Sequence, residues 1–359
     1  MRSARRMLIY AVMSAGALPM AAAQQQPARH WAIVLHGGAG VIERITMDPR
    51  TEAAYRASLT QAIQAGSAVL AQGGSSLDAI EAAIRILEDD PLFNAGRGAV
   101  FTAEGKNELD AAIMDGATLK AGAVAGVTRT RHPISLARAV MEKSPYVMLI
   151  GTGADGFAAE MGLEQVEPSF FFTERRWQSL VKQLKKEGRP IPQRPAGAQP
   201  PPTVPVAERE AEDAHRFGTV GVVALDRAGN IAAGTSTGGT QGKRWGRVGD
   251  TPIIGAGTYA SNKSCAVSAT GTGEYFIRLT VAREVCALVQ YKGMRLQQAA
   301  DDVIHKELKA LDGDGGLIAI APDGQMAWSF NTPGMYRARQ VEGGKLEIGI
   351  FAEPPTGKE

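Results

Sequence analysis

Thr219 and the glycine before it are the residues whose types and position best suit nucleophilic chemistry. Residues 187–206 are dense in proline, glycine and glutamine, and the sequence then changes to an apolar run at residues 220–225. If the bond between Gly218 and Thr219 is cut, Thr219 carries a free α-amine beside its own hydroxyl. Such an amine titrates near about 7.7 to 8.0 and can take the hydroxyl proton at neutral pH. A single residue would then supply both nucleophile and base.

Further polar and small residues follow at positions that could complete such a site. Thr237 ends the next expected strand, where its hydroxyl could bond to that of Thr219. Arg247 and Asp250 offer a cation and an anion three positions apart. That pair suits the α-carboxylate and α-ammonium of an amino-acid-like substrate. A strand-to-helix turn with hydroxyl and backbone N–H groups suits an oxyanion hole, and its members are Thr270, Gly271 and Gly273.

Each of these residues also has a purely structural interpretation. Thr219 and Thr270 can be ordinary β-branched strand residues, and Arg247 and Asp250 can be a loop pair. The sequence has no HExxH, P-loop or GxSxG motif, and its five histidines show no ligand spacing. Residues 151–156 read GTGADG after an apolar run, which is formally a dinucleotide motif, but no strand ending in an acidic residue follows. A glycine-mediated strand-to-helix turn is the favoured interpretation there.

The composition is that of a globular chain with a core. Of 359 residues, 44% are apolar and 21% are charged, and 39 Lys and Arg nearly balance 37 Asp and Glu. Neither nucleic acid nor a membrane surface is therefore expected as a partner. The two cysteines are Cys265 and Cys286. Two buried free thiols are the favoured interpretation, and a single disulfide in an exported protein stays open.

Two segments are expected to lie outside the folded domain. Residues 1–23 combine a basic start, a short apolar stretch and three alanines, which predicts a signal peptide cut after Ala23. The apolar stretch is too short to span a bilayer, so the mature chain is expected to be periplasmic or secreted. Residues 187–213 cannot build a core and are expected to form an exposed, disordered linker.

Strands and helices alternate before this linker, and strands dominate after it. Several strands, such as residues 220–225, are apolar throughout and must be buried on both faces. Two sheets packed face to face between two helix layers would satisfy this requirement. Hydrophobic periodicity predicts strands at residues 31–35, 108–114, 122–128, 146–150, 220–225, 231–237 and 265–270, hairpins at 317–330 and 336–351, helices at 51–71, 75–87, 133–141, 274–291 and 296–311, and a glycine-rich turn at 36–40.

Taken together, these motifs resemble the plant-type L-asparaginase/isoaspartyl peptidase branch of the N-terminal nucleophile hydrolases. The resemblance covers essentially all of the mature chain except the linker. Motifs in this number and order are highly specific. They are HGGAG at 36–40, FNAGRG at 93–98, ELDAAIM at 108–114, GTVG at 218–221, TSTGG at 235–239, GRVGD at 246–250 and TGTGE at 270–274.

The resemblance implies an α/β (α+β) domain with a four-layer αββα sandwich, made as one precursor. That precursor cuts itself into an α subunit, residues 24–218, and a β subunit, residues 219–359. Two αβ units then pair as a homodimer. The implied substrates are L-asparagine and β-aspartyl dipeptides, and no catalytic cofactor is implied.

The resemblance also assigns roles to single residues. Thr219 is nucleophile and base, and Thr237 supports its hydroxyl and takes part in processing. Arg247 binds the substrate's α-carboxylate and Asp250 its α-ammonium. Asn94 lies in a loop that buttresses the nucleophile.

For the remaining positions, the resemblance implies an oxyanion hole and a structural ion. Thr270 and Gly271 form the oxyanion hole, and Gly273 lies beside the substrate. A structural Na⁺ is implied, held by the backbone carbonyl groups of Leu87, Glu88, Asp90, Phe93, Ala95 and Arg97.

Two differences limit how far the properties of the family can be assigned to this sequence. Glycosylasparaginases share the fold and the threonine but usually carry aspartate before it, where this chain has Gly218. The signal peptide and the long proline-rich linker also depart from the usual pattern. An alternative from another class is a non-catalytic periplasmic protein that binds amino acids with Arg247 and Asp250 and keeps an unprocessed chain.

Overall fold

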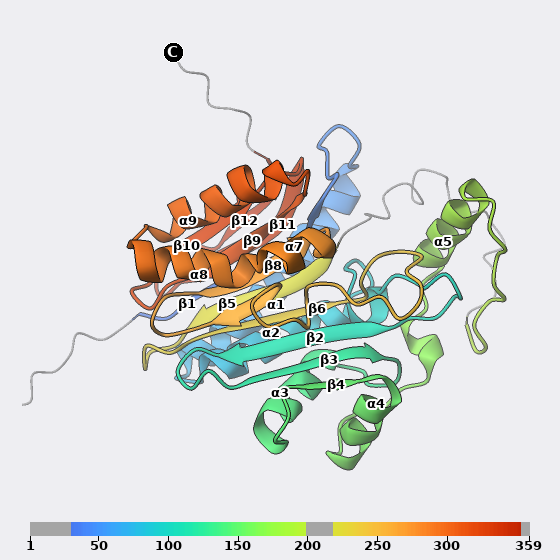
Figure 1. Cartoon of the computed structure of the whole chain (residues 1–359), viewed down its shortest axis with the longest axis horizontal. Helices are drawn as coiled ribbons and strands as arrows, with labels where there is room; N and C mark the ends of the chain where they lie inside the picture. Colours follow the sequence, from blue (N-terminus) through green and yellow to red (C-terminus); the bar gives the residue numbers. More distant parts are fainter. Residues whose placement is uncertain (1–29, 199–217, 353–359) are drawn as a thin grey trace, which may run out of the picture.

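The computed structural model describes residues 30–198 and 218–352. The proposed signal peptide and residues 199–213 of the linker lie outside these ranges. Within them, two β-sheets pack face to face, and helices cover the outer face of each (Figure 1). The predicted αββα sandwich is confirmed.

The larger sheet has eight strands in the order β12-β11-β1-β5-β6-β2-β3-β4. Neighbouring strands are antiparallel except β3 and β4, which are parallel. The strand bounds are β1 Ala32–Gly40, β2 Leu109–Asp115, β3 Ala121–Val127, β4 Met148–Ile150, β5 Thr219–Leu225, β6 Ile231–Thr237, β11 Gly334–Val341 and β12 Glu347–Phe351.

The smaller sheet has four antiparallel strands in the order β10-β9-β8-β7. Its inner face shares a buried apolar layer with the larger sheet. On β1, Ala32 and Val34 face this layer, whereas Ile33 and Leu35 face the helices on the other side. This double burial explains why the central strands are apolar throughout. The bounds are β7 Thr258–Ala260, β8 Ala266–Gly271, β9 Gly315–Ile320 and β10 Met326–Phe330.

The helix layers begin and end at residues that favour such boundaries. Asp48 caps the first helix, and Ser75 and Asp78 form a capping box at the second. Helices α1 to α4 cover the larger sheet, α7 to α9 cover the smaller one, and α5 lies to one side (Figure 1). The bounds are α1 Pro49–Ala71, α2 Ser76–Asp89, α3 Pro133–Lys143, α4 Gly151–Glu160, α5 Glu174–Lys186, α7 Gly273–Leu279, α8 Val281–Lys292 and α9 Leu296–Asp302, with a π-helical turn at Val303–Leu308.

Two local predictions were wrong, and one short strand was not predicted. Residues 36–40 are not a turn but the end of β1, which keeps pairing with β11 past a bulge between His36 and Gly38. The helix expected over 274–291 is broken at Thr280, whose left-handed φ of 50° separates α7 from α8. The strand β7 was not predicted, because its three residues are too few to give a periodic hydrophobic pattern.

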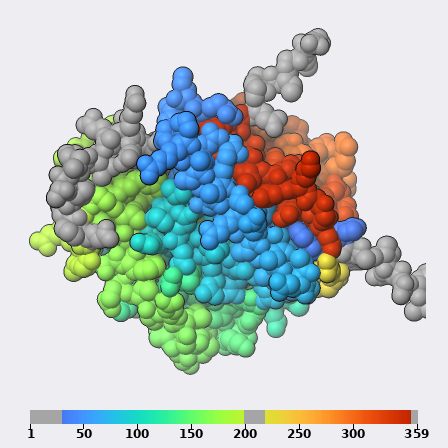
Figure 2. Space-filling view, turned by 180° about the vertical axis from the view of Figure 1, so that it is seen from behind, coloured from blue at the N-terminus to red at the C-terminus, as the bar shows by residue number. Residues whose placement is uncertain are grey.

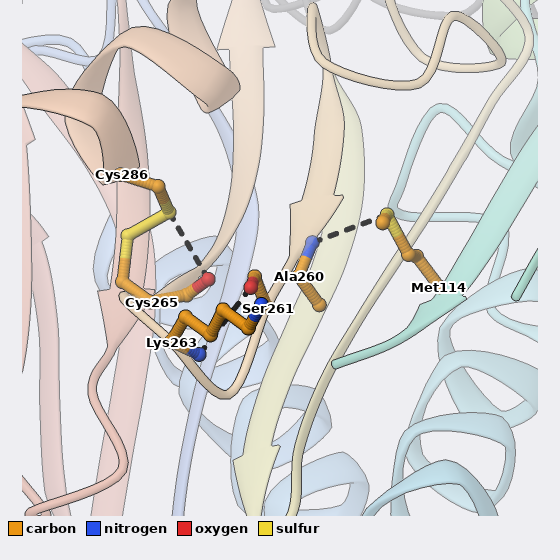
Figure 3. Close-up of a disulfide and its surroundings, with 6 residues drawn as sticks. All are labelled: Met114, Ala260, Ser261, Lys263, Cys265 and Cys286. Carbon is orange, nitrogen blue, oxygen red and sulfur yellow. Dashed lines mark hydrogen bonds between the residues drawn. A yellow bond between two sulfur atoms is a disulfide. The ribbon is translucent and has the colours of Figure 1, made fainter. Parts of the chain in front are cut away.

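The two cysteines are paired, so the favoured interpretation of two free thiols was wrong. A disulfide joins Cys265, just before β8, to Cys286 on α8 (Figure 3). The Cα atoms of the two residues are 5.2 Å apart, although 21 positions separate them in the sequence. The bond ties the helix layer to the strand that ends at Thr270 and Gly271.

The glycine motif at residues 151–156 does not form a dinucleotide site. Helix α4 begins at Gly151 itself, directly after the three-residue edge strand β4. No glycine loop therefore stands between strand and helix to receive a phosphate. Residues 187–198 contain no helix or strand, but they are not all exposed, because Arg194 pairs with Glu174 and lies over the ring of Phe172. None of the helices in the described ranges is long and apolar enough to cross a membrane.

Candidate active site

Thr219 is the first residue of β5, in the middle of the larger sheet. Its partner in the β5–β6 register is Thr237, the last residue of β6. The Thr219 hydroxyl donates to Oγ1 of Thr237 at 3.2 Å, and both side chains are buried. The ladder therefore places the two predicted hydroxyl groups side by side.

Thr237 contacts both sides of the bond before Thr219. Its hydroxyl accepts hydrogen bonds from the Thr219 hydroxyl and from the Gly239 backbone N–H at 3.0 Å. Its single proton points to the carbonyl oxygen of Gly218, 3.4 Å away. Thr237 thus bridges the Thr219 hydroxyl and the carbonyl oxygen of Gly218.

The backbone around Gly218 is closely packed. Gly38 on β1 has φ of +110°, and a Cβ there would lie 2.8 Å from the α-carbon of Gly218. On another side, a Cβ on Gly218 would lie 3.1 Å from that of Asn94. The HGGAG segment and the Asn94 loop therefore enclose the Gly218–Thr219 bond.

Asn94 joins its loop to the end of β6. Its Nδ2 donates to the Gly239 carbonyl at 2.8 Å, and its own carbonyl accepts the Gly238 N–H at 3.0 Å. Its Oδ1 accepts from the N–H of Val100 at 2.9 Å. With its backbone and side chain both engaged, Asn94 ties its loop to Gly238 and Gly239, which directly follow Thr237.

Arg247 and Asp250 converge on Gly273. A Cβ at Gly273 would lie 2.9 Å from Nη2 of Arg247 and 2.9 Å from Oδ1 of Asp250. Burial raises the pKa of the Asp250 carboxyl to about 7, and its Oδ2 has no hydrogen-bond partner in the part of the chain that the structure describes. A buried carboxyl group without a partner is an acceptor for a ligand donor such as an ammonium.

Arg247 and Asp250 are called the clamp below. Sequence reasoning missed a carboxylate that pairs with Arg247. Glu274, the first residue after Gly273, accepts two hydrogen bonds from Arg247, Nε to Oε1 and Nη2 to Oε2, both at 2.9 Å. This bidentate contact fixes the plane of the guanidinium and leaves Nη1 directed toward Gly249 and Gly239.

Thr270 and Gly271 end β8, on the opposing sheet. The Thr270 hydroxyl is buried and accepts a hydrogen bond from the Ala39 N–H at 3.3 Å. Ala39 follows Gly38, which abuts the Gly218–Thr219 bond. The structure therefore gathers the predicted oxyanion residues, the clamp and the threonine pair around one end of the sandwich.

Comparison with known proteins assigns this arrangement to a family. The family model for asparaginase matches residues 29–350. The chain belongs to the asparaginase family. It is 49% identical to the isoaspartyl peptidase of Escherichia coli (strain K12) over 321 residues, 89% of this chain and 96% of that protein. It is 42% identical to a probable isoaspartyl peptidase/L-asparaginase 2 of Arabidopsis thaliana, with 89% and 99% covered, and 41% identical to a plant-type L-asparaginase of Pyrococcus abyssi, with 87% and 97% covered.

In this member of the asparaginase family, four buried polar side chains near Thr219 are joined by hydrogen bonds. His36 Nε2 is 2.9 Å from the Ser268 hydroxyl, which is 2.7 Å from that of Thr235, and Thr258 donates to Thr235 at 2.7 Å. Burial lowers the pKa of His36 to about 3, so this imidazole is neutral. The glycine at position 221 is the trace that this hydrogen-bonded group leaves in the sequence. A Cβ at Gly221 would lie 1.9 Å from the Ser268 hydroxyl oxygen, so no larger residue fits there.

The segment predicted to hold Na⁺ consists of the last turn of α2 and the loop that follows it. A Cβ at Gly96 would lie 2.2 Å from the Glu88 carbonyl oxygen, and one at Gly98 would lie 2.0 Å from that of Phe93. The backbone is therefore closely packed at these two glycines. No group of three or more His, Cys, Asp or Glu side chains placed to hold a metal ion occurs in the described ranges.

A cavity of about 460 Å³ opens beside the clamp. Gly239, which bonds to both Thr237 and Asn94, directly precedes Thr240, the first residue of the β6–β7 segment that lines the cavity. Its lining residues come mainly from the segment between β6 and β7, with contributions from α5 and the start of α7: Gln183, Thr240, Gln241, Gly242, Lys243, Arg244, Trp245, Arg247, Thr272 and Glu274.

Proposed function

We propose that this protein is an autoprocessed threonine amidohydrolase that cleaves L-asparagine and β-aspartyl dipeptides. One observation carries the proposal. The hydroxyl of Thr219 lies 3.2 Å from that of Thr237, which in turn lies 3.4 Å from the carbonyl oxygen of the bond to be cut. The family relationship adds support, because relatives that cover nearly the whole chain are named as isoaspartyl peptidases and L-asparaginases.

In the proposed processing step, Thr219 Oγ1 attacks the carbonyl carbon of Gly218. The new C–O bond replaces the C–N bond, and the Thr219 nitrogen takes up a proton to become an amine. Water then hydrolyses the ester, giving the Gly218 carboxylate and restoring the threonine hydroxyl. The products are the chains 24–218 and 219–359.

In the proposed turnover, the freed α-amine of Thr219 takes the proton from Oγ1, which attacks the side-chain carbonyl carbon of the substrate. Arg247 holds the α-carboxylate and Asp250 the α-ammonium. Thr270 and Gly271 stabilise the developing oxyanion. Ammonia or an amino acid leaves, and water releases aspartate from the β-aspartyl ester.

Three further proposals accompany the proposed hydrolase activity, and they concern a bound ion, the oligomeric state and the location of the protein. A structural Na⁺ would be held by backbone carbonyl groups of the last turn of α2 and of the loop after it, namely those of Leu87, Glu88, Asp90, Phe93, Ala95 and Arg97. Two αβ units would pair, and exposed apolar residues on and beside the edge strand β4 offer a surface for contact, namely Tyr146, Val147, Met148 and Ile150. The mature chain would be periplasmic or secreted, which the disulfide favours because such bonds persist in oxidising compartments.

Denaturing mass spectrometry of the purified protein tests the proposal. We expect two fragments that meet at Gly218 and Thr219, together with ammonia release from L-asparagine. Thr219→Ala is expected to stay as one chain without activity. A wild-type chain that stays intact after prolonged incubation would favour an amino-acid-binding protein, and a Thr219→Ala variant that still splits or turns over would refute the mechanism.

A further inference from the structure

Trp245 lies at the outer part of the cavity in a strained backbone conformation. Its φ is 56° and that of Gly246 is 69°, and the Arg247 N–H donates to the Arg244 carbonyl at 2.9 Å. Two central residues with positive φ closed by this bond form a type I′ turn. Asparagine and glycine favour the first central position of such a turn, and a bulky aromatic residue there costs conformational energy.

The Trp245 side chain also gains little from packing. It is 88% exposed, whereas tryptophan residues that stabilise a fold are mostly buried. Arg244 lies against it, with the guanidinium carbon 4.1 Å from the ring centroid. A strained, exposed aromatic ring with a stacked cation at the rim of a cavity is a surface suited to a ligand.

Three cations line the cavity, and two of them are held in ion pairs, whereas Arg244 only helps to lower the pKa of the exposed Glu187 carboxyl. Arg247 is paired with Glu274, and Lys243 is buried near Glu108 and Asp110, with Nζ 3.9 Å from a carboxylate oxygen of each. Across the described ranges, no carboxylate lies within ion-pair distance of Arg244. The outer end of the cavity therefore presents one cation and one aromatic face.

This pattern matches the part of a β-aspartyl dipeptide that L-asparagine lacks. Both substrates place an α-carboxylate and an α-ammonium on Arg247 and Asp250. Beyond the scissile amide, asparagine carries only hydrogen, whereas the dipeptide carries a second residue with a side chain and a carboxylate. Aromatic or apolar side chains stack on tryptophan, and a carboxylate pairs with arginine.

We propose that Trp245 and Arg244 form a subsite for the second residue of β-aspartyl dipeptides, with preference for a large apolar side chain and a free carboxylate. The subsite rests on the proposed function, because it acts only on substrates held by the same clamp. It makes dipeptides, rather than asparagine, the substrates that use the whole cavity.

Trp245→Asn tests the subsite without straining the fold, because asparagine suits the turn. For the processed enzyme, kcat/KM is measured with β-Asp-Phe and with L-asparagine. We expect the ratio of the two values to fall about tenfold in the variant. Tyr291→Asn is the matched control, since Tyr291 is 72% exposed and also lies under an arginine, Arg283, but on α8. It is expected to leave the ratio unchanged.

Arg244→Gln tests recognition of the carboxylate. The wild type is expected to cleave β-Asp-Phe about tenfold faster in kcat/KM than its C-terminal amide, and the variant is expected to lose this preference. An unchanged dipeptide-to-asparagine ratio in Trp245→Asn, or a kept preference for the acid in Arg244→Gln, overturns the subsite. Failure of the proposed function is seen separately, as a wild type that releases no ammonia from L-asparagine.

Discussion

Binding of L-aspartate to the processed enzyme is expected to weaken about tenfold for each pH unit below about 7. Asp250 must be ionised to hold the ligand's α-ammonium, and burial raises the pKa of this carboxyl to about 7. About a tenth of the molecules would then carry an ionised Asp250 at pH 6, and about a hundredth at pH 5. Between about pH 5 and pH 7 the carboxylates and the ammonium of the ligand keep their charges, because they titrate near about 4 and above about 7.7.

Isothermal titration calorimetry with L-aspartate between pH 5 and pH 8 measures this dependence. Asp250→Asn is expected to bind weakly at every pH and to lose the slope. Asp226→Asn is the control, because Asp226 is equally buried but lies at the far end of β5 from Thr219. Succinate is aspartate without the ammonium group, and its binding is expected not to weaken as the pH falls.

Two results would refute the reasoning. A dissociation constant for L-aspartate that stays constant from pH 8 to pH 5 would show that Asp250 is ionised throughout or does not contact the ligand. A slope that persists in Asp250→Asn would assign the titration to another group.

Four further predictions concern the site and its support. Thr237→Val removes the hydroxyl that contacts both Thr219 and the Gly218 carbonyl, and we expect self-cleavage to slow at least about tenfold, followed as loss of the intact chain by mass spectrometry. Glu274→Ala frees the guanidinium of the clamp, and we expect KM for L-asparagine to rise about tenfold with a smaller change in kcat; a lower KM would mean that Glu274 competes with the substrate. Replacing Cys265 and Cys286 by alanine opens a loop with a separation of 21 residues, and we expect stability to fall by about 3 kcal/mol, measured by urea unfolding of the uncut chain. Ile150→Lys places a charge on the exposed β4 edge and is expected to convert dimers into single αβ units, measured by light scattering.

The sequence predicted most of the sandwich because hydrophobic periodicity is a local property. It also predicted the residues around Thr219, through motifs that recur in the family. It did not predict features that depend on distant residues. The bulge in β1 is held by pairing with β11, some 300 positions away in the sequence, and the bidentate contact of Glu274 with Arg247 spans 27 positions. The pairing of Cys265 with Cys286 required knowing that α8 packs on β8.

The order of strands in the larger sheet has a consequence for how the protein can be made. Strands β1 to β4 precede the proposed cut, and β5, β6, β11 and β12 follow it, yet β1 lies between β11 and β5. The surface shows the same mixing, since the first and last parts of the described chain lie side by side (Figure 2), and Arg44 lies 4.3 Å from the ring centroid of Phe351. Both cysteines lie after the cut, so no disulfide links the two products. After cleavage no covalent bond would join the two polypeptides, which would be held together by hydrogen-bond ladders, side-chain contacts and a shared core. Separately synthesised halves would each expose unpaired strand edges until they associated.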